Sequence, residues 1–438
     1  MSDLLAARLQ MAMSLAFHIW FAVAGIAMPV LMVISEWRWQ RTGDPIYLDL
    51  AKRWMKGTAI LFAVGAVSGT VLSFELGLLW PTFMEHAGPI IGMPFSMEGF
   101  AFFLEAIFLG VYLYGWDRIT PRAHLLSGVL VAVAGCASGI FVLITNAWMN
   151  APRGFDVVDG QFVNIDPIAG MLNPATVPEA LHMTLAAYAA LGFAVAGIHA
   201  FLLLRDATSV FHRRALAIAL WVGVPAALAL PISGDVSARY VARHQPAKLA
   251  AMEALFETQR GAPLLIGGWP DEEAGVVRFG IEIPYGLSLL AFHDPHAEVT
   301  GLNDIPEDER PPVAIVHLAF QVMVALGTYR AAVGLWVAWR AWRRRDLAGS
   351  RALLRALVLA GPMGLIAVQA GWIVTEVGRQ PWVIYGVMRT ADAVTPMPGL
   401  VVPFTVFTLL YLVLGTIVVF LLRREVAYAA SESTEGPE

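Results

Sequence analysis

The chain has 438 residues, of which 58% are hydrophobic and only 14% are charged, whereas a soluble domain carries about 25% charged residues. This composition excludes a soluble globular enzyme and a disordered chain, and the net charge of −5 leaves no basic surface for nucleic acid. A single cysteine, Cys136, excludes a disulfide framework and a thiolate-held iron–sulfur cluster. The fold class that remains is an all-α, polytopic membrane protein.

Nine apolar segments are long enough to cross a bilayer, which requires about 20 mostly apolar residues. Lys and Arg concentrate in the loops after the first, third, fifth and seventh segments, and these loops are therefore expected on the cytoplasmic side. This places the N-terminus outside and the C-terminus in the cytoplasm. The predicted transmembrane segments are residues 10–35, 55–80, 94–115, 124–148, 180–204, 214–233, 313–339, 353–376 and 399–422.

One predicted outer loop is long. It runs from Gly234 to Pro312, between the sixth and seventh segments, and holds thirteen acidic against six basic residues. Loops of this length are functional or disordered, and the apolar content of residues 279–285 favours a folded loop. We therefore expect a membrane domain over residues 1–425, the outer loop 234–312 within it, and a disordered cytoplasmic tail over residues 426–438.

Ionisable residues inside the predicted segments mark function, because burying them in a bilayer is costly. They include His18, His182 and Glu376. Two chemistries use such residues, namely proton or ion transport and axial ligation of haem iron. Met323 lies on the outer side, as His182 does, and a His/Met pair would hold a low-spin haem of raised potential.

Two further features carry polar groups into the membrane. Glu98 and Glu105 are seven residues apart and share one helix face, which suits a proton relay, although helix–helix hydrogen bonds are the alternative. Trp372 and Glu376 share a face near the end of the eighth segment. Arg379 follows at the membrane edge, where it can hold a haem propionate or the Glu376 carboxylate.

The stretch Gly371–Trp382, with the pattern G-W-x-x-x-E-x-G-R-Q-P-W, resembles subunit I of the cytochrome bd-type quinol oxidases. The resemblance covers residues 1–425, and the nine segments with a long outer loop after the sixth match that family's fold. Other matching stretches are Ala7–Gln10 with His18, Glu98–Glu105, Gly115–Arg118, Asn146–Met149, Asn173–Pro174 with His182, Lys248–Glu253, and Ala319–Phe320 with Met323.

The resemblance implies a set of haem ligands. His182 and Met323 are the expected axial ligands of a low-spin haem b558. His18 and Glu376 are the expected ligands of two high-spin haems, b595 and d, and the sequence does not assign which residue holds which haem. An open coordination position on a high-spin haem is where oxygen can bind.

The resemblance also implies roles for residues around the haems. Glu98 and Glu105 are expected on the proton path or next to a haem. Trp372 is expected between haems, and Arg379 is expected to be a haem-site cation.

Quinol oxidation is expected in the outer loop. Lys248 and Glu253 lie on a stretch, residues 245–257, of helical composition. Five residues apart, they sit about 140° apart on a helix and could flank a quinol headgroup, with Lys248 as hydrogen-bond donor and Glu253 as proton acceptor. The alternative is a solvated amphipathic helix.

The sequence departs from the family pattern in two places. Gln321 stands where the family has an arginine two residues before the methionine ligand, and Glu75 stands where it has a glutamine. Together with the short outer loop, these features resemble the cyanide-insensitive branch. A haem b in the place of haem d is therefore a second expectation.

The expected function is that of a terminal oxidase subunit in the bacterial cytoplasmic membrane. It oxidises quinol at the outer face, reduces oxygen to water with cytoplasmic protons, and generates a proton motive force without pumping. Expected partners are a homologous membrane subunit II and a small single-span subunit. The alternatives are a proton-coupled transporter and a b-type cytochrome with a non-oxygen acceptor. The sequence leaves open the quinone type, the cyanide sensitivity and the oligomeric state.

Overall fold

The computed structural model describes residues 1–432, and the side chains of residues 1–424. Within this part, nine helices are long and apolar enough to cross a membrane. Each predicted segment lies within one of them to within two residues at either end. These helices are α1 (Asp3–Thr42), α2 (Pro45–Leu79), α3 (Pro81–Tyr114), α4 (Pro121–Asn150), α6 (Thr176–Arg205), α7 (Val210–His244), α10 (Val313–Trp342), α11 (Arg351–Val377) and α13 (Val401–Glu432).

Local sequence explains where several of these helices begin. Thr120 caps α4 by accepting from the backbone N–H of Ala123, and Pro121 follows at the first helical position, where its missing N–H costs nothing. Ser350 caps α11 in the same way. Gly43, with φ of 69°, ends α1 in the left-handed conformation.

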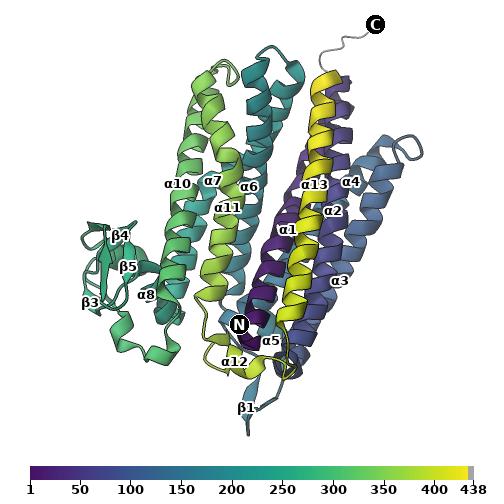
Figure 1. Ribbon diagram of the computed structural model, residues 1–438. Coiled ribbons are helices and arrows are strands. Elements are labelled where there is room, and N and C mark those ends of the chain that lie inside the picture. The colour runs from purple at the N-terminus through teal and green to yellow at the C-terminus, as the bar shows by residue number, and fades with distance from the viewer. Residues whose placement is uncertain (433–438) are drawn as a thin grey trace.

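Apart from α13, these helices form two groups, one of α1, α2, α3 and α4 and the other of α6, α7, α10 and α11 (Figure 1). In one group, α1 packs against α2 and α4, and α3 packs against α4. In the other group, α6 and α10 each pack against both α7 and α11, so α6 and α10 stand at opposite corners of a four-helix bundle. Helix α13 covers α1 and α2, and contacts of α6 with α1 and α4 join the two groups.

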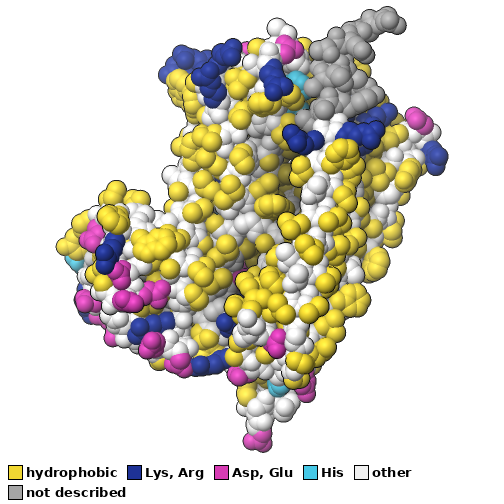
Figure 2. Space-filling model, viewed as in Figure 1, with side chains coloured by type: hydrophobic (Ala, Val, Ile, Leu, Met, Phe, Trp, Pro, Cys, Tyr) yellow, Lys and Arg dark blue, Asp and Glu magenta, His cyan; other side chains and the backbone are white. Residues whose placement is uncertain are grey.

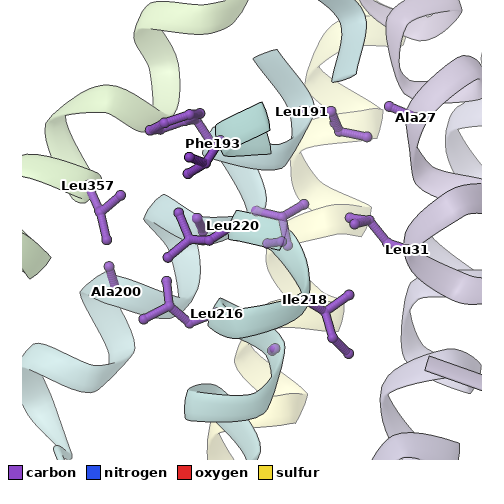
Figure 3. Packing of buried hydrophobic residues seen from close by; sticks show 14 of the residues in the cluster. Ala27, Leu31, Leu191, Phe193, Ala200, Leu216, Ile218, Leu220 and Leu357 are labelled. Carbon is purple, nitrogen blue, oxygen red and sulfur yellow. The ribbon is translucent and has the colours of Figure 1, made fainter. Parts of the chain in front are cut away.

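Small residues bring the helices of the second group close together. A Cβ atom on Gly192 of α6 would lie only 2.5 Å from the Cα atom of Gly223 of α7, so these backbones touch. Phe193, Leu216 and Leu357 pack around this crossing in the largest buried cluster (Figure 3).

The predicted outer loop is folded. Helix α7 continues through the first residues of this loop and ends at His244. In this extension Arg239 and Asp235 form an ion pair one helical turn apart, which suits a helix that extends into water. The remainder contains the helices α8 (Pro246–Glu253) and α9 (Gly286–Phe292), the short 3₁₀ turns Leu302–Asp304 and Glu307–Glu309, and three two-stranded antiparallel sheets. The paired strands are β3 (Gln259–Arg260) with β8 (Glu298–Val299), β4 (Leu264–Ile266) with β7 (Ile281–Ile283), and β5 (Trp269–Asp271) with β6 (Val276–Arg278).

Further short elements lie at the same end of the molecule as this loop (Figure 1). They are the hairpin β1 (Asp156–Val158) and β2 (Gln161–Val163), α5 (Pro167–Met171), the pair β9 (Trp382–Ile384) and β10 (Met388–Arg389), and α12 (Thr390–Ala393). At the opposite end, the tail expected to be disordered over residues 426–438 is helical as far as Glu432, and residues 433–438 lie outside the described part.

The types of side chain on the surface change along the length of the helices. Hydrophobic side chains form a broad band around the bundle, whereas charged side chains gather at its two ends (Figure 2). Lys and Arg dominate the end that carries the α6–α7 and α10–α11 connections, and acidic side chains are more frequent on the folded outer loop. This is the distribution expected of a chain that spans a bilayer.

Candidate functional site

His182 is held in one tautomer by Ser233. The Nδ1 atom of His182 lies 2.9 Å from the Ser233 hydroxyl, and this hydroxyl donates its proton to the carbonyl oxygen of Leu230 at 3.0 Å. The serine oxygen therefore accepts from the imidazole, which carries its proton on Nδ1. The lone pair of Nε2 is left free to bind a metal, as metal-ligating histidines require.

His18 has the same arrangement in the other helix group. Its Nδ1 atom lies 2.9 Å from the Ser68 hydroxyl, which donates to the carbonyl oxygen of Val64 at 3.0 Å. A Cβ atom on Gly69 would lie 2.9 Å from the imidazole, so the ring position requires a glycine there. His18 therefore also presents Nε2 as a ligand atom.

His182 and Met323 lie at the same level of the four-helix bundle. Ala190 of α6 contacts Gly364 of α11. Because these helices are antiparallel, His182, eight residues before Ala190, is level with the residue eight positions after Gly364, which directly follows Gly371. Met323 of α10 touches Gly371, since a Cβ atom there would lie 3.1 Å from the methionine sulfur.

At this level, the two predicted ligands lie across the bundle from one another. His182 is on α6 and Met323 is on α10, the helices that stand at opposite corners. Glycines line both ligands, with Gly371 beside Met323 and Gly234 beside His182. A group bound between diagonal helices would meet a nitrogen donor from one side and a thioether from the other.

Glu376 and Arg379 form the expected ion pair at the outer-loop end of α11. The Arg379 Nη2 atom donates to Glu376 Oε2 at 2.6 Å, and Asn146 donates to the other carboxylate oxygen. Each oxygen keeps a second lone pair, so the carboxylate can still bind a metal. Arg379 is only 2% exposed, and its Nε and Nη1 atoms have no hydrogen-bond partner in the described chain.

Lys248 is connected to this ion pair. Its Nζ atom donates to the Asn150 side-chain oxygen at 2.8 Å, and the Asn150 amide nitrogen donates to Asn146. A polar chain therefore runs from Lys248 through two asparagines to Glu376. Burial, with the nearby charge of Arg379, lowers the pKa of Lys248. Asn150 is a functional candidate that was not predicted from the sequence, although its helical i, i+4 spacing from Asn146 is a signal that could have indicated it.

Glu253 lies on the same short helix as Lys248 but meets different partners. Helix α8 confirms the helical prediction for residues 245–257 only as far as Glu253, and both side chains are buried, so it is not a solvated helix. Burial raises the pKa of Glu253 to about 8, partly offset by a hydrogen bond from the Leu265 backbone. One carboxylate oxygen of Glu253 has no protein partner in the described chain. Within the described residues, no hydrogen bond or ion pair joins Glu253 to Lys248.

Gln321 fastens strand β4 and the residues after it to α10. Its side-chain oxygen accepts from the backbone N–H of Gly267 at 2.9 Å, and its nitrogen donates to the Leu265 carbonyl at 3.0 Å. An arginine at this position could not make the first bond, because a guanidinium has no acceptor. The departure from the family pattern at Gln321 thus has a structural role two residues before Met323.

Glu98 and Glu105 do share one face of α3, turned toward α4. Ser138 donates to Glu98 at 3.2 Å, and a Cβ atom on Gly135 would lie 3.0 Å from the Glu105 carboxylate. Glu105 is buried and has no charged partner in the described chain. The pair is therefore placed as the sequence predicts.

Trp372 lies in a small cluster between the two predicted histidine sites. The cluster contains Ile19, the neighbour of His18, and Met183, the neighbour of His182. The indole N–H is buried without a partner in the described chain.

Comparison with known proteins identifies the family. The model of the family described as cytochrome bd terminal oxidase subunit I matches residues 6–430. The chain belongs to the cytochrome bd oxidase subunit I family. A putative cytochrome bd menaquinol oxidase subunit I of Bacillus subtilis is 38% identical over 96% of each chain. A cytochrome bd ubiquinol oxidase subunit 1 of the same organism is 33% identical over 98% of this chain and 95% of that one.

A solved structure supports the same assignment. The bd oxidase from Geobacillus thermodenitrificans superposes with a TM-score of 0.92 at 41% identity, covering 98% of this chain and 99% of that chain. As a member of the cytochrome bd family, the protein is a subunit of a quinol oxidase in the bacterial inner membrane. Such oxidases use haem and quinol, reduce oxygen and work with a subunit II.

The described residues fit haem groups. Two histidines present Nε2 in a fixed tautomer, and Met323 and Glu376 add the thioether and carboxylate donors used in haem proteins. Glycines beside His18, His182 and Met323 keep side chains away from these donors. The unpaired nitrogen atoms of Arg379 can hold the carboxylate of a haem propionate.

Proposed function

We propose that this chain carries three haems and that His182 and Met323 bind the low-spin haem b558. The observation that carries the proposal is the serine-held tautomer of His182, diagonal to Met323 in the bundle. His18 and Glu376 bind the two high-spin haems, b595 and d, or a further haem b in the place of haem d. Once bound, these groups supply one-electron transfer and an open coordination position for oxygen.

Quinol is oxidised at the folded loop. Glu253 accepts a proton from the quinol hydroxyl, because its buried carboxylate has one oxygen without a protein partner in the described chain and a pKa raised to about 8. Lys248 orients the quinol headgroup, or it orients the polar chain of Asn150 and Asn146 that leads to Glu376. These two residues act at neighbouring positions of one site rather than as a contacting pair.

The loop end faces the outside, and the end rich in Lys and Arg faces the cytoplasm. Quinol protons therefore leave on the outside. Protons for water formation enter from the cytoplasm, so electron transfer separates charge without pumping.

A line of polar groups supports this proton path. Glu98, Glu105 and Tyr112 follow one another at intervals of seven residues on α3 and share a face. Beyond them, toward the Lys- and Arg-rich end, His124 donates from Nε2 to the Tyr112 carbonyl, and its Nδ1 atom lies 2.9 Å from the buried carboxylate of Glu36. These groups lead toward the Lys- and Arg-rich end and can pass protons to Glu105 and Glu98.

Trp372 lies between the haem held by His18 and the haem held by His182. Arg379 holds the Glu376 carboxylate and a haem propionate. The small single-span subunit completes the assembly with subunit II.

The test is spectroscopy combined with oxygen uptake on the purified assembly with subunit II. The proposal predicts a Soret band, dithionite-reduced α bands and quinol-driven oxygen uptake. A colourless preparation would favour the transporter alternative. A coloured protein that oxidises quinol without oxygen uptake would favour a cytochrome with another acceptor.

A further inference from the structure

Arg330 is a buried cation for which the described chain offers no partner. It is 2% exposed, and its Nε and Nη1 atoms make no hydrogen bond. The two other buried cations among residues 1–424 are bonded, Arg379 to Glu376 and Lys248 to Asn150. An unpaired charge in a protein interior is strongly unfavourable, so Arg330 is a candidate for a functional charge.

The guanidinium lies inside the four-helix bundle. Arg330 follows Met323 by seven residues, so the two share one face of α10. A Cβ atom on Gly364 of α11 would lie 2.9 Å from Arg330 Nη1, and only 2.6 Å from the Cα atom of Ala190 on α6. The guanidinium therefore occupies the space where α6, α10 and α11 meet.

We propose that Arg330 is a positioning residue that raises the reduction potential of the low-spin haem. This inference rests on the proposed ligation by His182 and Met323. Reduction adds one electron to the iron site, and a nearby positive charge favours the form with the added electron. Seven helical residues separate Arg330 from Met323 by about 10 Å along the axis. At that distance and an effective dielectric constant of about 20, the charge changes the equilibrium on the order of tenfold.

The experiment is a redox titration of the haem α bands in the purified assembly with subunit II. Arg330→Met and Arg330→Gln remove the charge, and Arg330→Lys keeps it. Arg340→Met is the matched control, because it removes a cation from the far end of the same helix. We expect the two neutral variants to favour the oxidised low-spin haem on the order of tenfold, a midpoint about 59 mV lower for one electron. Band position and haem content should remain at the parent values.

The lysine variant should retain most of the parent midpoint, and the Arg340 variant should retain all of it. A neutral variant that titrates like the parent would overturn the inference. A lysine variant whose midpoint potential falls as far as that of the methionine variant would also overturn the inference, because the effect would then come from shape rather than charge. A parent protein without a low-spin α band would instead contradict the ligand assignment, which separates failure of the proposed function from failure of this inference.

Discussion

Ser233 holds His182 through a hydrogen bond of 2.9 Å, and Ser68 repeats this contact with His18 in the other half of the molecule. In both pairs the serine hydroxyl donates to its own helix backbone, so the imidazole proton must lie on Nδ1. The two histidines predicted as ligands thus share a supporting group that leaves Nε2 free. This recurrence supports a common role in binding iron.

Removal of either serine should weaken one haem and spare the other. We expect Ser233→Ala to lower affinity for the low-spin haem, and Ser68→Ala to lower affinity for one high-spin haem, each by about 10–100-fold. Haem content and difference spectra measure both. Ser35→Ala is the control, because Ser35 is also buried and bonded to its own helix but contacts no histidine. Equal loss of all haems in every variant would indicate a general folding defect.

Removal of the Glu376 carboxylate should affect oxygen chemistry selectively. Glu376→Ala takes away the proposed iron ligand and leaves the buried Arg379 without its anion. We expect loss of one or both high-spin haems and of oxygen uptake, while the low-spin band survives. Full haem content together with persistent oxygen turnover would show that Glu376 is not a ligand.

The sequence predicts the nine long apolar helices of residues 1–432 well, because bilayer-spanning segments are long and apolar. It also predicts from helical spacing that Glu98 and Glu105 share a face, and it offers Glu376 as one of two partners for Arg379, which follows three residues later. These features depend on neighbours along one helix.

Relations between distant segments could not be predicted in this way. The serine partner of His182 is 51 residues away on another helix, and no local pattern marks it. Likewise, the predicted 140° separation of Lys248 and Glu253 was compatible with one shared headgroup. That spacing could not indicate their protein partners, because tertiary packing brings Lys248 to Asn150 on α4 and Glu253 beside Leu265 in the loop.

The quinol site should show a pH dependence set by Glu253. An acid with a pKa raised to about 8 is mostly protonated below that pH and becomes a base above it. Quinol-driven oxygen uptake should therefore rise as the pH passes through about 8. Glu253→Gln should strongly reduce uptake and abolish this rise, with all haem bands intact and with an artificial donor still oxidised. Glu257→Gln, an exposed neighbour, should behave like the parent. Parent-like quinol turnover in Glu253→Gln would place quinol elsewhere.

Asn150 should couple the loop to the membrane domain. It accepts from Lys248 and Gln245, and it donates to Asn146. Asn150→Ala leaves the buried ammonium of Lys248 without its acceptor, so we expect a loss of about 1.5–3 kcal/mol in unfolding free energy. Quinol oxidation should fall while the low-spin band remains. Thermal unfolding together with donor-specific oxygen uptake checks this, and unchanged values for both would remove Asn150 from the quinol site.

The reduced-minus-oxidised spectrum of Met323→Leu tests the haem assignment most directly. Leucine has a similar volume, so the variant should fold, because such exchanges cost less than about 1.5 kcal/mol in a core. The leucine side chain cannot bind iron. The low-spin α band should disappear, and the haem should become high-spin or be lost, while the other two haems remain. An unchanged low-spin band in this variant would contradict ligation of one haem by His182 and Met323.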